Sequence, residues 1–265
     1  MKEKVSVTIE KSVISDLDKL IDHINIKNRS HAVEYLIRKA LGENKTAVIL
    51  SGGDPELLRV SKFEFRPTVN IKGNYLIELQ LRKLKENNFN NVFIIGRKEV
   101  LSAIFDIVKS GEDYGIKANY IEEKKSNGTA ESLRLLKGRI NNTFLVVFCD
   151  ILFDKINIKE LWETHIRHNY IATLILTTSS QPKKGIVKLE GTKALDFTQA
   201  PKGADMFIGF SSMFVAEPKI FDFEGKSFES DIFPRIAAMG LLGGHVSSEK
   251  EVHIHSKQDI ENLRR

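Results

Sequence analysis

The chain has 265 residues, of which 42% are hydrophobic and 28% charged, and this composition favours a soluble globular protein. Its net charge of +5 is too mild to indicate nucleic acid binding by itself, and no apolar run reaches the roughly 20 residues that a membrane span needs. The first residues lack the apolar core of a signal peptide. Because Cys149 is the sole cysteine, we expect no intrachain disulfide and a cytoplasmic location.

The first 43 residues predict one short strand followed by two helices. Val5 to Ile9 alternate between apolar and polar residues, which is typical of a half-buried strand. Ser12 can cap the first helix, and Asn28 can cap the second, which Gly42 is placed to end. Each helix has apolar residues at helical spacing on one face: Ile14, Leu17, Leu20, Ile21 and Ile24 in the first, and Val33, Leu36, Ile37, Ala40 and Leu41 in the second.

This short unit is incomplete as a single copy. A lone strand leaves backbone groups unpaired on both edges, and about 40 residues bury too little surface for a stable core. A symmetric second copy supplies the missing strand and lets the helices of the two copies interlock. We therefore expect residues 1–43 to form a homodimer or a higher assembly.

The unit resembles the ribbon-helix-helix family of DNA-binding proteins over its whole length, through the strand KVSVTI, the helix that begins at Ser12 and the second helix NRSHAVEYLIRKAL. The resemblance implies double-stranded DNA as a partner, with the two-stranded ribbon in the major groove. The apolar strand residues Val5, Val7 and Ile9 would face the core. The expected DNA-binding residues are Lys4, Ser6 and Thr8 at base edges, and Asn28, Arg29 and Ser30 at a phosphate. The alternative is a dimerisation module whose polar strand face never touches DNA.

From Lys45 to the C-terminus, strand-like and helix-like segments alternate. Nearly continuous apolar strands between amphipathic helices predict a mostly parallel sheet covered on both faces, in a three-layer, Rossmann-like α/β fold. After Thr178 the segments GIVKLEG, ALDFTQ and MFIGFSSMFVAEP predict antiparallel additions, which make the sheet mixed. Glu43-Asn44 is the expected boundary, so the domains are 1–43 and 45–265. The expected strands are TAVILS, NVFIIG, KANYI, TFLVVFCD and ATLILTT, and the expected helices are LIELQLRKLKENN, VLSAIFDIVKSG, TAESLRLLKGRI and NIKELWETHIRH.

Ligands of such sheets bind beyond the carboxyl ends of the strands. Three elements are expected there: the Gly52-Gly53 turn, the turn at Gly128-Thr129 that opens a helix, and Asp150 at the end of VVFCD. A carboxylate in that place suits Mg²⁺, which favours carboxylate and phosphate oxygens. Each element alone also fits an ordinary helix start or a capping aspartate, and it is their convergence that favours a site.

Together these elements resemble the sugar-1-phosphate nucleotidyltransferases, over roughly Lys45 to the C-terminus. The matching segments are AVILSGG, FRPTVNIKGNYLIELQLRKLKENNFNNVFI, EEKKSNGTAESLRLLK, FCDILF, IGFSSMFVAEPKIF, SFESDIFPRIA and HIHSKQDIENLRR. The resemblance implies an enzyme that joins a sugar phosphate to a nucleoside triphosphate and releases pyrophosphate, with Mg²⁺ as cofactor where a nucleotide is bound. It implies that Glu123 faces the base and that Gly128 lies under it. It assigns nucleotide binding to Leu50, Gly52, Gly53, Glu123, Gly128 and Thr129, catalysis to Arg66 and Asp150, and the metal to Asp150.

This sequence departs from the pattern of that family at several charged positions. The family's glycine-rich loop carries an arginine for the triphosphate, but here the loop contains Asp54-Pro55-Glu56 and the arginine position falls on Leu57. Arg66 replaces a lysine, a second lysine position falls on Ala200, and a second metal-binding aspartate falls on His253. A site poor in cations and carboxylates holds a Mg-triphosphate badly, so we expect catalysis to be impaired or lost.

These features support two main hypotheses. The favoured one is a DNA-binding regulator whose degenerate nucleotidyltransferase-like domain binds a nucleotide or nucleotide-sugar as a signal, or helps the protein to oligomerise. The alternative is an active, Mg-dependent sugar-1-phosphate nucleotidyltransferase that its first domain dimerises. A structural protein that coats DNA is a third interpretation. The residues at positions 57 and 253 favour the regulator.

Overall fold

The structure, a computed structural model of the whole chain, describes residues 4–21, 26–41, 45–62, 64–125, 128–179, 185–199 and 207–264. The chain divides into two compact units, Met1–Asn44 and Lys45–Arg265. In the described part of the chain, no helix is both long enough and apolar enough to cross a membrane.

The first unit contains the helices α1 (Lys11–Asp18) and α2 (Arg29–Leu41). Asn28 caps α2 as expected, because its side-chain oxygen accepts a hydrogen bond from the backbone N–H of His31 at 2.9 Å. The cap position of α1 is Glu10, so Ser12 lies inside the first turn of that helix instead of before it. The expected helix end at Gly42 lies outside the described residues.

The strand expected over residues 4–9 is not formed in the single chain. Val5 is 75% exposed and Val7 is 65% exposed, so neither lies in a core, and Ile9 is half-buried. The physical reason is that a strand needs a second strand to pair its backbone groups, and one copy of the unit has none to offer among its described residues. The buried apolar residues described in this unit are Leu17 and Ala32.

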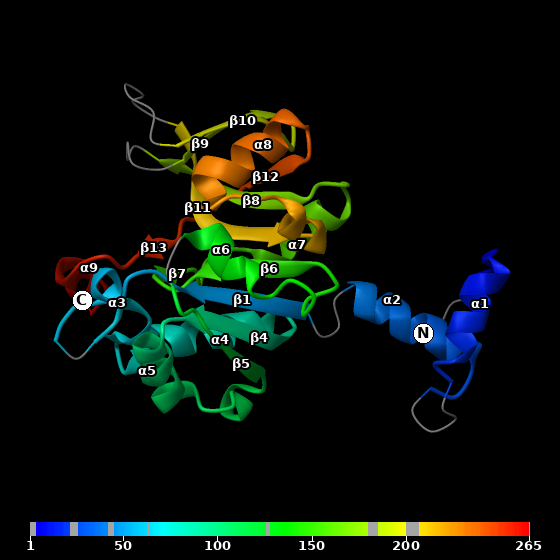
Figure 1. Cartoon of the computed structure of the whole chain (residues 1–265), viewed down its shortest axis with the longest axis horizontal. Helices are drawn as coiled ribbons and strands as arrows, with labels where there is room; N and C mark the ends of the chain where they lie inside the picture. The colour runs from blue at the N-terminus through cyan, green and yellow to red at the C-terminus, as the bar shows by residue number, and fades with distance from the viewer. Residues whose placement is uncertain are drawn as a thin grey trace. The chain divides into compact units, whose positions relative to one another are not determined.

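The second unit is built on a mixed sheet of nine strands in the order β5-β4-β1-β6-β11-β8-β12-β10-β9, which runs upward from β5 in Figure 1. The strands β5, β4, β1 and β6 are parallel, whereas β11 lies antiparallel to both β6 and β8, and β9 and β10 form an antiparallel pair. The predicted antiparallel additions after Thr178 are therefore confirmed. The strand bounds are β1 Lys45–Ser51, β4 Phe89–Gly96, β5 Lys117–Glu122, β6 Phe144–Phe148, β8 Ala172–Ser179, β9 Gly185–Glu190, β10 Lys193–Gln199, β11 Phe207–Ala216 and β12 Leu242–Val246.

Two short strand pairs lie outside the main sheet. The first is β2 (Asn70–Ile71) with β3 (Asn74–Tyr75), and the second is β7 (Ile151–Leu152) with β13 (Val252–His253). The second pair brings Val252 and His253 beside the segment that follows β6.

Helices cover both faces of the sheet, as the apolar strands predict. Along β1, Ala47 and Ile49 belong to one buried apolar cluster and Val48 and Leu50 to another, because successive strand residues face opposite sides. The first cluster contains residues of α4 (Leu76–Glu86), α5 (Lys98–Val108) and α7 (Ile158–Ile166). The second contains residues of α6 (Thr129–Arg134) and α8 (Phe233–Ala238). The remaining helices are α3 (Pro55–Leu58) and α9 (Lys257–Arg264), with single 3₁₀ turns at Arg66–Thr68, Glu112–Tyr114 and Pro218–Asp222 and a π turn at Phe228–Ile232.

We expect Phe214→Ala to lower the free energy of unfolding by about 3–5 kcal/mol, the usual cost of emptying a buried phenylalanine site. Phe214 is fully buried, and its ring lies 5.0 Å from the ring of Phe228 and 5.2 Å from that of Phe233. Phe105→Ala is the matched control, because Phe105 is 48% exposed and leaves a smaller cavity. Urea denaturation measures both. Equal losses for the two variants would show that the aromatic cluster is not part of the core that stabilises the sheet.

Candidate functional site

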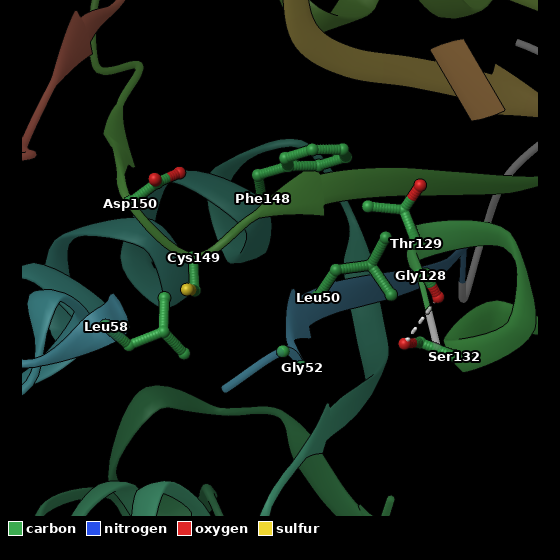
Figure 2. A pocket seen from close by; sticks show the side chains of 10 residues that line it. Leu50, Gly52, Leu58, Gly128, Thr129, Ser132, Phe148, Cys149 and Asp150 are labelled. Atoms are coloured by element: carbon green, nitrogen blue, oxygen red, sulfur yellow. Dashed lines mark hydrogen bonds between the residues drawn. The ribbon is translucent and has the colours of Figure 1, made fainter. Parts of the chain in front are cut away.

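A cavity of about 160 Å³ lies at the carboxyl ends of β1 and β6 (Figure 2). The two strands are parallel, with Leu50 beside Phe148, so the segments that follow them leave the sheet at the same edge. Six residues that the sequence assigns to a nucleotide or metal meet here. The lining residues are Leu50, Gly52, Gly53, Leu58, Gly128, Thr129, Ser132, Phe148, Cys149 and Asp150.

Glu123 lies beside this cavity but does not line it. Its side chain is buried, with 3% of the residue exposed. One carboxylate oxygen accepts a hydrogen bond from the Gly53 N–H at 3.1 Å, and the other accepts one from the Ser132 hydroxyl at 2.5 Å. A Cβ on Gly52 would stand 2.6 Å from the same carboxylate, so a larger residue there would displace the Glu123 side chain. The Glu123 carboxylate links the glycine turn to α6, and the expectation that Glu123 faces a base stays a prediction.

A structural constraint that the sequence does not reveal also requires glycine at position 128. Its φ is +136°, and a Cβ on it would stand 2.3 Å from the carbonyl oxygen of Lys226. The next residue continues this attachment, because the Thr129 hydroxyl accepts a hydrogen bond from the Phe228 N–H at 3.1 Å and donates one to Glu229 at 3.3 Å. The start of α6 is therefore held against the segment 226–229.

The loop after β1 brings no cation to the cavity. Asp54 caps α3 by accepting a hydrogen bond from the Glu56 N–H at 3.0 Å, and Leu57 on this helix is 71% exposed. Arg59 is tied to its own loop, with Nε 3.0 Å from Glu56 and Nη1 3.1 Å from the carbonyl oxygen of Lys62. The residues that line the cavity include no lysine or arginine.

Asp150 is held in place by its backbone neighbours. Gln80 on α4 is buried and donates hydrogen bonds through its side-chain nitrogen to the carbonyl oxygens of Phe148 at 3.1 Å and Ile151 at 2.8 Å. The Ile254 N–H donates to the carbonyl oxygen of Asp150 itself at 2.8 Å. Burial raises the pKa of the neighbouring Cys149 thiol well above its usual value, so Cys149 does not serve as a thiolate nucleophile.

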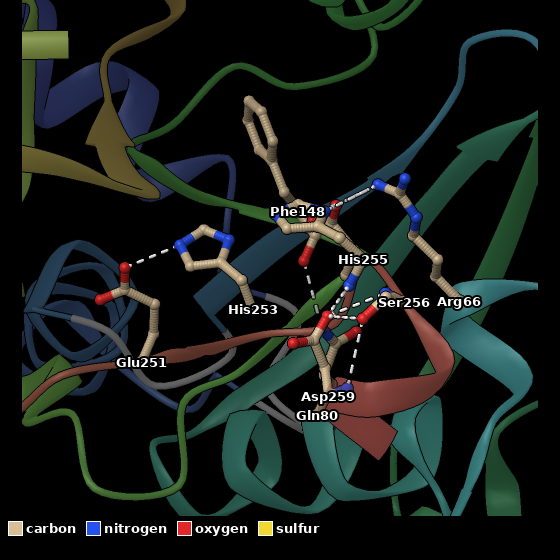
Figure 3. A network of polar contacts seen from close by, with 9 residues as sticks. Arg66, Gln80, Phe148, Glu251, His253, His255, Ser256 and Asp259 are labelled. Atoms are coloured by element: carbon tan, nitrogen blue, oxygen red, sulfur yellow. Dashed lines mark hydrogen bonds and ion pairs between the residues drawn. The ribbon is translucent and has the colours of Figure 1, made fainter. Parts of the chain in front are cut away.

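Figure 3 shows a polar network that includes Arg66 and His255, and both of these side chains contact the Asp150 carboxylate. Arg66 Nη1 lies 2.9 Å from Asp150 Oδ2 and 3.0 Å from His255 Nδ1, and His255 Nδ1 lies 3.5 Å from the same Asp150 oxygen. The structure therefore pairs the two predicted catalytic residues, Arg66 and Asp150, with each other. His255, which sequence reasoning missed, completes the group.

His253 stands where the resemblance calls for a metal-binding aspartate. Its Nε2 lies 2.8 Å from Glu251 Oε1, and its ring stacks on the ring of His255 with the centroids 5.3 Å apart. The hydroxyl of Ser211 also donates a hydrogen bond to the Glu251 carboxylate. This neighbouring carboxylate is thus bound by protein groups.

The described residues do not fit a divalent metal held by the protein alone. They contain no group of three or more His, Cys, Asp or Glu side chains placed to hold a metal ion. Asp150 offers one carboxylate, and one of its oxygens already accepts from the Arg66 guanidinium. Mg²⁺ usually takes one or two carboxylates together with phosphate oxygens and waters.

The six residues predicted to contact DNA divide into three groups. Lys4, Ser6 and Thr8 are exposed, as base-contacting residues must be. Asn28 and Ser30 flank the start of α2, with Asn28 as its cap. Arg29 makes a two-point ion pair with Asp18, with both N···O distances at 2.7 Å, and this hydrogen bonding lowers the pKa of Asp18. In the single chain, Arg29 links α2 to α1.

The model of the nucleotidyl transferase family matches residues 46–241, and the chain belongs to that family. Two similar solved structures share this fold. The first, from Bacillus anthracis, bears the name "putative glucose-1-phosphate thymidylyltransferase" and was solved in complex with a sucrose; it is 19% identical, with a TM-score of 0.73, and the match covers 83% of this chain and 94% of that one. The second is HddC from Yersinia pseudotuberculosis, 18% identical with a TM-score of 0.67, over 83% of this chain and 98% of that one. HddC was also solved complexed with GMP-PN, and that structure has a TM-score of 0.68 at 19% identity. No curated protein shows a significant match.

Gly128→Ala is expected to destabilise the protein and to open the start of α6, because the new Cβ would overlap the Lys226 carbonyl. Gly138→Ala is the control for a left-handed glycine in open space, because its φ is +79° and nothing lies within 4 Å of its Cβ position. The control should lose about 1–2 kcal/mol from the left-handed backbone alone, and Gly128→Ala should lose clearly more. Thermal denaturation compares them, and equal losses would mean that the contact with Lys226 is unimportant.

Proposed function

We propose that the second unit binds a nucleotide or a nucleotide-sugar in the cavity at the ends of β1 and β6. The observation that carries this proposal is the meeting of Gly52, Gly53, Gly128, Thr129 and Asp150 around one cavity. Two glycine turns leave room for a ligand to approach the backbone closely. The complex of HddC with GMP-PN supports a nucleotide ligand in a chain of the same fold.

Membership of the nucleotidyl transferase family makes sugar-1-phosphate nucleotidyl transfer the first candidate activity, ahead of a purely regulatory role. The solved structure described as a glucose-1-phosphate thymidylyltransferase supports a hexose 1-phosphate as the class of second substrate. The charges around the cavity favour slow turnover. Leu57 supplies no cation for a triphosphate, and His253 supplies no second carboxylate beside Asp150.

We expect pyrophosphate release from any nucleoside triphosphate and hexose 1-phosphate, with Mg²⁺ present, to be close to background. Each missing electrostatic contact costs about 100- to 1000-fold in rate. The double variant Leu57→Arg with His253→Asp is expected to raise turnover, because it restores the cation and the carboxylate that the family pattern calls for. A coupled pyrophosphate assay across the four triphosphates measures both proteins.

Asp150→Ala in the double variant is the control for a reaction at this site, and it should return turnover to background. Robust turnover by the unchanged chain that disappears with Asp150→Ala would show that the site is catalytically complete. Failure of nucleotides and nucleotide-sugars to shift the melting temperature would count against binding itself.

The second candidate function is DNA binding by a dimer of the first unit. The supporting observations are the Asn28 cap, the exposed polar residues Lys4 and Thr8, and a large exposed apolar surface on so small a unit. Helix α1, the turn after it and helix α2 expose apolar side chains that a second copy would cover: Val13, Leu20, Tyr35, Leu36 and Ile37, each 39% exposed or more. Such a protein would combine a DNA-binding dimer with a domain whose ligand acts as a signal.

Lys4→Ala and Thr8→Ala are each expected to relax the sequence preference of DNA binding, by about 1–3 kcal/mol of discrimination per good base contact. Arg29→Ala should weaken binding to all sequences alike, because it would contact phosphate. Asp18→Ala controls for the ion pair that Arg29→Ala also breaks. Electrophoretic mobility shifts at low salt, with specific and random duplexes, measure these effects.

Deleting residues 1–44 should abolish both DNA binding and self-association, the latter read by light scattering. An unchanged assembly after the deletion would remove the dimer from the proposal. Absence of DNA binding by the full chain at low salt would refute the second candidate function.

A further inference from the structure

The charges around Asp150 favour an anion over a metal cation. Arg66 is the positive member of this network, and its side chain is 20% exposed while that of Asp150 is 14% exposed. A guanidinium has five N–H donors and no acceptor. Both hydrogen bonds that Arg66 makes to described residues run through Nη1, and its buried Nε has no partner among them. Within the described part of the chain, the protein therefore uses only one of the three guanidinium nitrogens, and of the other two Nε is buried.

His255 adds a second donor to the same place. Because Arg66 can only donate, His255 Nδ1 must accept its hydrogen bond, and the ring proton of a neutral His255 then lies on Nε2. The His255 side chain is 55% exposed, which leaves that N–H accessible to a ligand. The backbone around it is fixed, because Asp259 accepts hydrogen bonds from the His255 N–H at 3.0 Å and the Ser256 N–H at 2.8 Å (Figure 3).

A divalent cation meets unfavourable contacts at this point. It would have to share Asp150 with a guanidinium that already lies 2.9 Å from the carboxylate. The nearby carboxylate of Glu251 accepts from Ser211 and lies 2.8 Å from His253, and its side chain is 1% exposed. At Asp150 a cation therefore meets a carboxylate that is already paired with a guanidinium, whereas an anion meets donors of Arg66 and His255.

We propose that Arg66 and His255 form a phosphate-binding site that works without a divalent cation, at the Asp150 edge of the cavity. The ligand class is a phosphoryl group, either of inorganic pyrophosphate or of the nucleotide or sugar phosphate in the cavity. This inference rests on the proposed function, because it assigns the metal requirement of that same site. Charge-assisted hydrogen bonds from a guanidinium take over the charge compensation that a metal supplies elsewhere.

Isothermal titration calorimetry of the full chain tests the proposal with three probes: pyrophosphate, a panel of nucleoside monophosphates, and glucose 1-phosphate. Each is titrated once in EDTA and once in excess MgCl₂. We expect the two dissociation constants of each bound probe to agree within about twofold, because binding at this site uses no metal. For comparison, a tenfold change would correspond to about 1.4 kcal/mol. Arg66→Ala should weaken binding by about tenfold or more, and His255→Ala by less.

Asp150→Asn gives the sharpest contrast. The asparagine keeps an oxygen that accepts from Arg66 but removes a negative charge beside the guanidinium, so the affinity for phosphate should be unchanged or higher in EDTA. A metal-mediated site would lose affinity in the same variant. Lys155→Ala, which removes an exposed lysine on the loop after β7, is the control for general loss of positive charge. Circular dichroism confirms that each variant is folded, and Arg66→Lys provides a conservative replacement if Arg66→Ala is not.

The outcomes separate this inference from the proposed function. Binding of nucleotides only with MgCl₂, lost in Asp150→Asn, would overturn the inference and leave nucleotide binding intact. Pyrophosphate binding in EDTA that depends on Arg66, without any nucleotide binding, would support the inference and refute the proposed function. Binding of no phosphate probe under either condition would overturn the inference as well.

Discussion

The parallel pairing of β1 with β6 is the constraint on which the site of the second unit depends. Leu50 lies beside Phe148, and the Cys149 N–H donates to the carbonyl oxygen of Leu50 at 3.0 Å, so the ladder continues to the last residue before Asp150. The glycine turn and the acidic turn therefore leave the sheet side by side. A shift of register would move Gly52 away from Asp150.

Once the two turns are adjacent, the partners of the Asp150 carboxylate determine whether it can serve as a metal ligand. An aspartate at the end of such a strand would serve as a metal ligand if it were free and if another carboxylate faced it. Here the carboxylate is paired with Arg66, and the position expected to hold a second aspartate is the histidine His253. The fold is that of a nucleotidyl transferase, while the electrostatics of this corner are reversed relative to a site that gathers cations.

Local patterns were enough to predict the alternating elements of the second unit, because apolar periodicity reports which faces are buried. They were also enough to bring Gly52, Gly128 and Asp150 to one place, because strand ends of a parallel sheet share an edge. Contacts between side chains and residues far apart in the sequence could not be predicted. Glu123 turns inward to Gly53, 70 positions away, and Gln80 fastens Ile151, 71 positions away. Nothing in the local sequence of either residue signals such a partner.

The strand expected at residues 4–9 illustrates a different limit. Its alternating pattern describes a face that fits a partner, and the pattern alone does not say whether that partner belongs to the same chain. With no second strand to pair with, Val5 and Val7 are exposed and the backbone of this segment is irregular. A pattern of this kind predicts a capacity for pairing, which becomes structure only when the partner is present.

The pairing of β13 with β7 bears on how the protein is made. Ile254 bonds to the backbone of Asp150, and His255 meets Arg66 across 189 positions of sequence, so the corner around Asp150 joins chain segments that are synthesised far apart in time. During translation the sheet strands β1, β4 and β6 emerge long before residues 252–259 do. Since domains fold while the chain is still growing, strands β1, β4 and β6 can pair before residues 252–259 join the corner around Asp150. The corner around Asp150 is therefore completed later than the strands that carry the glycine turn.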